Sequence, residues 1–189
     1  MESINQNNEK LEIDLYIDSL KGYKKLSLED KIEIINKSKD TANEVYLHFK
    51  KRNKLNLNDL FTDYGVKIFF NDSEDYGILS YYDKANNELR IYKKTIETYI
   101  EVLEANSEYS FSYEKFLDIL LAHEFFHVYE MNEEKVYTFT DMYKRKVLFF
   151  EIGEKILEAS EIGANEFSRL YNNMDVSLEI LNNIVSLNN

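Results

Sequence analysis

The stretch LLAHEFFHVYE, Leu120–Glu130, holds two of the three histidines of the chain, four residues apart, with a glutamate directly after the first. Apolar residues at helical spacing surround it, which predicts a core helix that begins at Ser112. Positions i and i+4 of a helix project from one face, so His123 and His127 can bind one Zn²⁺ together. Glu124 then points beside the metal, where it can act as a base on metal-bound water.

The competing explanation is that both histidines are hydrogen-bonded core residues without a metal. It would have to account for a pair at ligand spacing in an otherwise apolar helix, with a carboxylate between them. A charged glutamate in such a helix is costly unless it is paired or bound to something. The metal site is therefore the better explanation of the stretch.

Two histidines leave a catalytic zinc site incomplete, since three protein ligands and a water are usual. The remaining histidine, His48, is distant in the sequence on a polar helix face, so a carboxylate is expected. Glu130 shares the face of the histidines, and further candidates fall near one helical stripe downstream: Glu151, Glu154, Glu158 and Glu161. Periodicity does not choose among them. Local context favours Glu161, because small residues that would let a second helix approach closely surround it: Ala159, Ser160, Gly163 and Ala164.

Short β-rich runs precede the metal helix and predict a small sheet. They are GVKIFFN (65–71), GILSYYD (77–83) and NELRIY (87–92), and polar or glycine-containing segments separate them. We expect a mostly antiparallel sheet of three or four strands. It should pack on the metal helix and on the glutamate-bearing helix, which makes the fold class α+β.

Helical patterns account for most of the remaining chain. The first fifty-odd residues are predicted to be helical, and Ser27 with Asp30 resembles a capping box at a helix start. Amphipathic periodicity predicts further helices over 93–106, 143–172 and 176–187.

Length and composition limit the number of domains and the kinds of binding site that the chain can have. A length of 189 residues suits one domain over 1–189, with an N-terminal helical region at 1–60, a core at 61–174 and a last helix at 175–189. There is no cysteine, which excludes disulfides and thiolate ligands. A net charge of −12 argues against direct nucleic-acid binding and against anionic membranes. No apolar signal segment or membrane span is evident, so a cytoplasmic location is expected, with export by an unusual route left open.

Two segments together resemble a known family. LLAHEFFH (120–127) and EIGANEFSRL (161–170) are similar to the ImmA/IrrE-type metallopeptidases, compact gluzincins with H-E-x-x-H followed by E-x-x-A-N-x-F-A. The matching residues of the second segment are Glu161, Ala164, Asn165 and Phe167, with Ser168 in place of the last alanine. The resemblance covers about Gly65–Tyr171 and implies a minimal gluzincin-like fold. It also implies that His123, His127 and Glu161 bind Zn²⁺ and that Glu124 is the general base. Phe126 departs from the family, which often has a small residue there, and this bears on the shape of the cleft.

The same resemblance suggests roles for residues around the metal. Gluzincins often hold a histidine through an acidic residue four positions after the third ligand. Here Asn165 stands at that position, and its carbonyl could accept the imidazole N–H, although local capping or packing is the alternative. A tyrosine such as Tyr129 or Tyr171 could stabilise an oxyanion.

The strand 87–92 is the expected edge strand for an extended substrate. Its candidate contacts are Asn87, Leu89 and Ile91, and the alternative is an interior strand.

The predicted function is hydrolysis of peptide bonds by a zinc-dependent endopeptidase. The partner would be a protein or peptide substrate, and the resemblance implies a regulatory, repressor-like protein such as a transcriptional repressor. The first alternative is a non-catalytic zinc-binding interaction protein that keeps the peptidase fold. The second is a delivered toxin-type protease, against which the absent signal segment counts.

Overall fold

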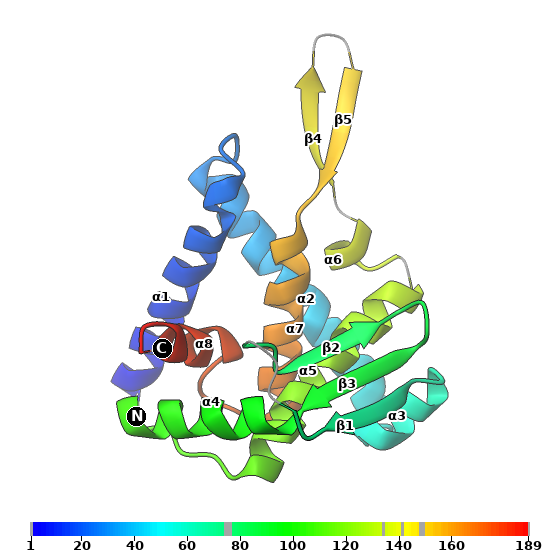
Figure 1. The fold of residues 1–189 in the computed structure, drawn as a ribbon. Helices are drawn as coiled ribbons and strands as arrows, with labels where there is room; N and C mark the ends of the chain where they lie inside the picture. Colours follow the sequence, from blue (N-terminus) through cyan, green and yellow to red (C-terminus); the bar gives the residue numbers. More distant parts are fainter. Residues whose placement is uncertain (1, 74–76, 134, 141, 148–149, 189) are drawn as a thin grey trace.

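A small sheet lies against one side of a group of helices in an α+β fold (Figure 1), which confirms the expected class. The computed structural model describes residues 2–73, 77–133, 135–140, 142–147 and 150–188. Its elements are α1 (Glu2–Ser19), η1 (Leu20–Gly22), α2 (Leu28–Lys51), α3 (Leu57–Asp63), β1 (Lys67–Asn71), β2 (Ser80–Asp83), β3 (Glu88–Tyr92), α4 (Lys93–Asn106), α5 (Tyr113–Glu133), α6 (Tyr137–Thr140), β4 (Met142–Val147), β5 (Phe150–Lys155), α7 (Leu157–Asn172) and α8 (Leu178–Ser186).

Side-chain caps mark the start of two of the predicted helices, α2 and α5. The Oγ of Ser27 accepts from the backbone N–H of Asp30 at 3.1 Å, and the Asp30 carboxylate accepts from the backbone N–H of Ser27 at 2.9 Å. This is the expected capping box at the start of α2. The backbone N–H of Lys115 donates to the Oγ of Ser112, so α5, the helix that carries His123 and His127, begins where the sequence predicted.

The three-stranded sheet has the order β1-β3-β2 and is mixed, so the expectation of a mostly antiparallel sheet is wrong. A short turn ending at Asn87, which has a φ of 55°, joins β2 and β3 as an antiparallel pair. β1 pairs with β3 in parallel on the other side. β1 and β2 follow each other in the chain, yet β3 lies between them in the sheet, and strand order of this kind is not encoded in local pattern.

β3 is therefore the central strand, and the prediction of a substrate-binding edge there is wrong. Leu89 and Ile91 are fully buried in the core. Asn87 is engaged within the protein, since it donates to the backbone carbonyl of Tyr64 and accepts from the hydroxyl of Tyr82. The strand that lies at the edge beside α5 is β2.

The helix predicted over 143–172 is wrong in its first half. β4 and β5 form an antiparallel pair in which Val147 pairs with Phe150, and the two strands project from the body of the molecule (Figure 1). Their sequence is rich in aromatic and β-branched residues, which favour strands over helix. Only α7, from Leu157, continues as the predicted helix.

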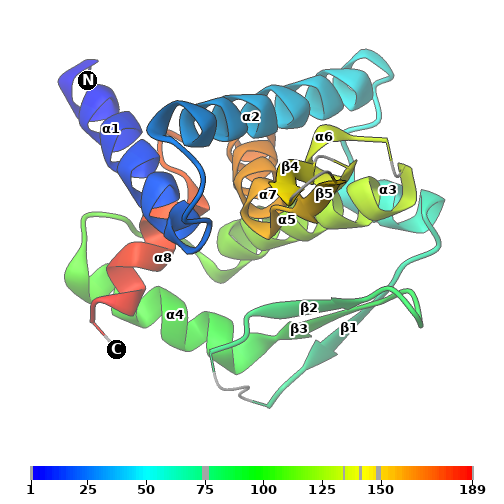
Figure 2. The ribbon, with the colours of Figure 1, turned by 90° about the horizontal axis from the view of Figure 1, so that it is seen from above.

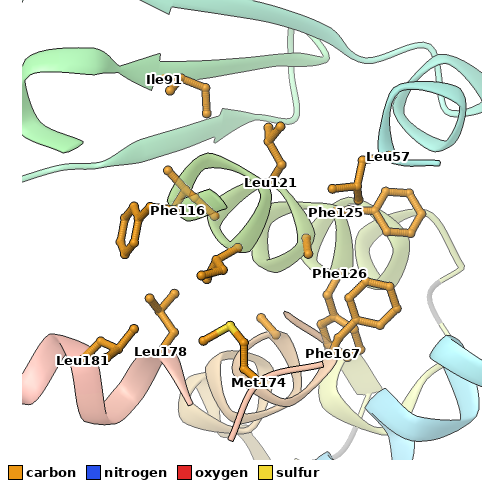
Figure 3. Packing of buried hydrophobic residues seen from close by; sticks show 14 of the residues in the cluster. Leu57, Ile91, Phe116, Leu121, Phe125, Phe126, Phe167, Met174, Leu178 and Leu181 are labelled. Atoms are coloured by element: carbon orange, nitrogen blue, oxygen red, sulfur yellow. The ribbon is translucent and has the colours of Figure 1, made fainter. Parts of the chain in front are cut away.

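The core is built around α5, which lies between the sheet and the helices α2 and α7 (Figure 2). Figure 3 shows Phe125 and Phe126 of α5 side by side with Phe167 of α7. Each of the three is 0% exposed, and the Phe126 and Phe167 ring centroids are 5.9 Å apart. Phe126 therefore fills the interface between α5 and α7 and does not shape the cleft. Among the described residues, no helix has the length and apolar character needed to cross a membrane.

Candidate metal centre

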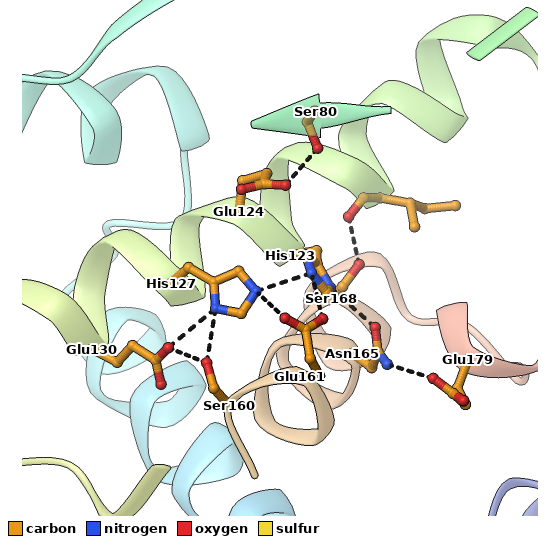
Figure 4. Close-up of polar contacts among 11 residues, drawn as sticks. Ser80, His123, Glu124, His127, Glu130, Ser160, Glu161, Asn165, Ser168 and Glu179 are labelled. Carbon is orange, nitrogen blue, oxygen red and sulfur yellow. Dashed lines mark hydrogen bonds and ion pairs between the residues drawn. The ribbon is translucent and has the colours of Figure 1, made fainter. Parts of the chain in front are cut away.

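Two helices bring the predicted ligands together (Figure 4). α5 carries His123, Glu124 and His127, and α7 carries Glu161. The close approach of α7 depends on Gly163, because a Cβ at this position would lie only 2.7 Å from the ring of Phe126. The small residues around Glu161 thus permit the helix contact that the sequence predicted from them.

The three candidate ligands form a triangle. The Nε2 atoms of His123 and His127 are 3.1 Å apart. The Oε2 of Glu161 lies 3.5 Å from the Nε2 of His123, and its Oε1 lies 3.4 Å from the Nε2 of His127. Ligand atoms bound at about 2.0–2.1 Å to one tetrahedral ion are about 3.3–3.4 Å apart. The three side chains therefore form a group that could hold one metal ion. The Glu161 side chain is 59% exposed, so the group is accessible from the side of Glu161.

His123 is held from behind by an amide. The Oδ1 of Asn165 lies 3.0 Å from the Nδ1 of His123, and the Nδ2 of Asn165 donates to Glu179 at 3.4 Å. An acceptor at Nδ1 requires the proton on that nitrogen, which leaves the lone pair of Nε2 pointing at the triangle. This tautomer is the one that binds a metal through Nε2.

His127 has a carboxylate in the corresponding position. Glu130, which is 1% exposed, has its Oε1 at 3.1 Å from the Nδ1 of His127. The hydroxyl of Thr138 donates to Glu130 at 2.7 Å, and that of Ser160 donates to it as well. Glu130 thus joins α5, α6 and α7 and orients His127 from the side away from the triangle, instead of serving as the third ligand.

Glu124 lies beside the triangle and outside the ligand group. Its side chain is buried on α5, and its Oε1 accepts from the hydroxyl of Ser80 at 2.5 Å. Ser80 is the first residue of the edge strand β2. The strand therefore holds the carboxylate in place at the wall of the site.

The charged groups around the site shift one another's pKa values. Burial lowers the pKa of His123, and the charge of His127 lowers it further. Burial also lowers the pKa of His127, but the hydrogen bond with Glu130 and the charge of Glu161 outweigh it and raise the pKa to about 9. Burial raises the pKa of Glu130, but its hydrogen bonds from His127, Ser160 and Thr138 leave it below the ordinary value. Glu130 is therefore ionised at neutral pH, and a metal ion bound here would displace a proton from His127.

The triangle opens into a cavity of about 1190 Å³. Its walls come from β2, α4, α5, α7 and α8, together with the end of β5. The described lining residues are Gly77, Ile78, Leu79, Ser80, Tyr81, Tyr82, Thr95, Thr98, Tyr99, Val102, Leu120, His123, Glu124, His127, Glu130, Met131, Lys155, Leu157, Ser160, Glu161, Leu178, Asn182, Val185 and Ser186. A cavity of this size accommodates several residues of an extended peptide.

Several other candidates from the sequence lie away from this site. Tyr129 packs against the rings of Phe49 and Tyr64, and the hydroxyl of Tyr171 donates to the backbone carbonyl of Leu55. Neither tyrosine lines the cavity, so their proposed oxyanion role is wrong.

The remaining candidate ligands do not join the triangle. His48 lies on α2 with its ring edge against Phe49, and Glu158 is not part of the ligand group. The side chains of Glu151 and Glu154 lie outside the described residues.

Three residues of the site, Ser80, Ser160 and Glu179, were not predicted from the sequence to take part in it. Ser80 and Glu179 come from segments distant in sequence from the motif, and neither residue type signals a role by itself. Ser160 drew notice only for its small size, yet its hydroxyl lies 3.0 Å from the Nδ1 of His127. Its position directly before Glu161 was the available signal.

Comparison of the chain with protein-family models, with curated proteins and with solved structures finds no match to any of them.

Proposed function

We propose that the chain is a zinc-dependent metalloendopeptidase of the ImmA/IrrE type, acting on a specific protein. The observation that supports it best is the ligand triangle of His123, His127 and Glu161 with the carboxylate of Glu124 beside it, open to a large cavity. A structural zinc site would be closed by a fourth protein ligand, whereas this group offers three ligands among the described residues and is open to the cavity.

The chain's own groups account for the proton transfers of hydrolysis. In the proposal the triangle holds one Zn²⁺, which supplies a Lewis acid for water and for the scissile carbonyl. Glu124 takes a proton from the attacking water and passes it to the leaving amine. The hydroxyl of Ser80 directs one oxygen of Glu124 and leaves the other for this exchange. Asn165 and Glu130 keep both imidazoles in the ligand tautomer.

The edge strand β2 is the proposed docking site for the substrate backbone. It replaces the strand at 87–92 in this role, because β2 lies at the sheet edge and borders the cavity next to Glu124. An extended peptide can add to such an edge through main-chain hydrogen bonds. The resemblance makes a cytoplasmic transcriptional repressor the first substrate to test, and the charge of −12 leaves direct nucleic-acid binding outside the proposal.

Replacement of Glu124 by Gln tests the proposal. The amide keeps the shape of the side chain but cannot act as a base, so we expect full zinc binding and a loss of peptide cleavage of at least about 100-fold. Zinc content by elemental analysis and cleavage of a peptide mixture by mass spectrometry are the measurements. Equimolar zinc with no cleavage by the wild type would favour the non-catalytic alternative, and protein purified with zinc that stays metal-free would refute the metal site.

A further inference from the structure

Two lysines at one end of the cavity pack on the same aromatic ring. The Nζ of Lys155, the last residue of β5, lies 4.0 Å from the ring centroid of Phe139 on α6. The Nζ of Lys84, which directly follows β2, lies 5.7 Å from the same centroid. Both distances are within the range of a cation–π contact. Segments far apart in the sequence therefore bring two ammonium groups to one place.

Neither lysine has an acidic partner among the described residues. Lys84 donates to a neutral acceptor, the backbone carbonyl of Met131, at 2.8 Å, and Lys155 contacts the ring. The carboxylate of Asp83, next to Lys84 in the chain, accepts instead from the side-chain amide of Asn86 at 2.8 Å. In a chain with 35 acidic and 23 basic side chains, these two ammonium groups therefore stay available for an anionic group of another molecule.

The two lysines mark the end of the cavity that lies beyond His127. Lys155 lines the cavity, and so does Met131, whose carbonyl holds Lys84. Met131 lies four residues after His127 on α5, about one helical turn farther along the helix. α6, which carries the shared ring, packs against both α5 and α7. A peptide in the cavity can therefore reach both ammonium groups.

The edge strand β2 relates this end of the cavity to the reacting groups. Ser80, the first residue of β2, donates to Glu124, and Lys84 follows the last residue of the strand. Four residues of extended chain span about 13 Å. α5 gives a similar spacing, because Glu124 and Met131 are seven helical residues, or about 10 Å, apart. A substrate on the edge of β2 with its scissile bond at Glu124 therefore has a residue about four positions from the cut beside the lysines.

We propose that Lys84 and Lys155 form a cationic subsite for an acidic side chain of the substrate, Asp or Glu, about three to five residues from the scissile bond. The proposal rests on the proposed peptidase function and adds a sequence requirement for the substrate. The other described charged residues that line the cavity are acidic: Glu124, Glu130 and Glu161. An acidic side chain is therefore favoured at the two lysines and disfavoured beside Glu124, which fixes the register of the peptide.

Profiling of a randomised peptide mixture tests the subsite in two arms. In the first arm, zinc-loaded wild type cleaves the mixture, and mass spectrometry reads the residues on both sides of the cut. In the second arm, zinc-loaded Glu124→Gln protein binds the same mixture without cleaving it, and the bound peptides are sequenced. We expect Asp and Glu to be enriched about 5-fold or more over Lys and Arg at one position on one side of the cut, which is the size of one exposed ion pair.

Charge reversal connects this preference to the two lysines. Lys84→Glu and Lys155→Glu should each reverse it, so that peptides with Lys or Arg at the same position are preferred. Lys50→Glu is the matched control, because the Nζ of Lys50 also packs on a ring, 5.2 Å from the centroid of Tyr46, but lies on α2 outside the cavity lining. Its preference should match that of the wild type. Zinc content by elemental analysis should be equimolar in all three variants, since none of these lysines belongs to the ligand group.

The outcomes separate the subsite from the chemistry. Cleavage without an acidic preference, or with one that either cavity variant leaves unchanged or that Lys50→Glu also reverses, overturns the subsite and keeps the peptidase. Binding with a preference that both cavity variants reverse, without cleavage by the wild type, overturns the peptidase and keeps the subsite. Zinc-loaded protein that neither binds nor cleaves any peptide overturns both.

Discussion

Replacing Gly163 by Ala tests whether the metal site depends on the close approach of α7 to α5. The added Cβ would lie 2.7 and 2.8 Å from two ring atoms of Phe126 and 3.0 Å from the Cγ2 of Thr138. Both neighbours are buried, at 0% and 1% exposure, and Thr138 also donates to Glu130. The ring cannot swing into solvent, so the two helices have to separate or the ring has to shift against Phe167.

Two effects of opposite sign decide the size of the change. Overpacking of a filled core costs about 1–3 kcal/mol. Alanine in place of glycine inside a helix returns about 1 kcal/mol. We therefore expect a net loss of about 1 kcal/mol in the free energy of unfolding, which lowers the Tm by about 2–4 °C in a chain of this size. Since Glu161 lies two residues earlier on α7, the same displacement should weaken zinc binding by about 10-fold, the order seen when the support of a ligand is lost.

Thermal unfolding and competitive zinc titration measure both effects. Gly22→Ala is the control, because a Cβ there meets nothing within 4 Å, and it should leave zinc binding unchanged. Phe126→Leu in the Gly163→Ala background should restore part of the zinc affinity by making room for the methyl group. A Gly163→Ala protein with wild-type stability and wild-type zinc affinity would refute the reasoning that this helix contact places the third ligand.

Further predictions concern the ligands and their support. Glu161→Gln should weaken zinc binding by at least about 100-fold in a competitive titration. This is more than the loss expected when a residue that only supports a ligand is replaced. Glu130→Gln should weaken it by about 10–100-fold, because His127 loses its charged partner. Zinc at 100 times its Kd should raise the free energy of unfolding by about 2.7 kcal/mol and the Tm by about 5–10 °C in thermal unfolding, and a chelator should reverse the shift.

Glu158→Gln is the control for both glutamate variants, since Glu158 lies one turn before Glu161 on α7 but outside the ligand group. A loss of zinc affinity as large in Glu158→Gln as in Glu161→Gln would contradict the assignment of the third ligand. Unchanged affinity in Glu130→Gln would mean that Ser160 alone suffices to orient His127. A Tm that does not respond to zinc would contradict a metal site present only in the folded chain.

Features with a local cause were predictable from the sequence. The i, i+4 spacing on a helix brings His123 and His127 to one face in any tertiary context. The capping box at Ser27 closes within one helical turn and needs no other part of the chain. Gly163 and its small neighbours marked the helix contact, because small side chains allow close approach whichever partner meets them.

Features that depend on distant segments were not predictable. Glutamates at one helical stripe looked equivalent, but β4 and β5 form an antiparallel pair and only the last part of the stretch belongs to α7. The strand 87–92 was recognisable as a strand, but its central position follows from β1 pairing on its far side. Ser80 and Glu179 reach the site only through the sheet edge and α8.

The sequence by itself determined a pair of imidazoles, a neighbouring carboxylate and a close-packing second helix, because helix periodicity and side-chain size act over a few residues. Only the tertiary structure decided that Glu130 lies behind His127 while Glu161 lies beside both imidazoles. From periodicity alone, both glutamates were candidates for the third ligand. Their roles differ because the packing of α7 against α5 leaves the Glu130 carboxylate at the Nδ1 of His127 and brings the Glu161 carboxylate to the Nε2 atoms of both histidines. That packing depends on contacts between residues far apart in the chain.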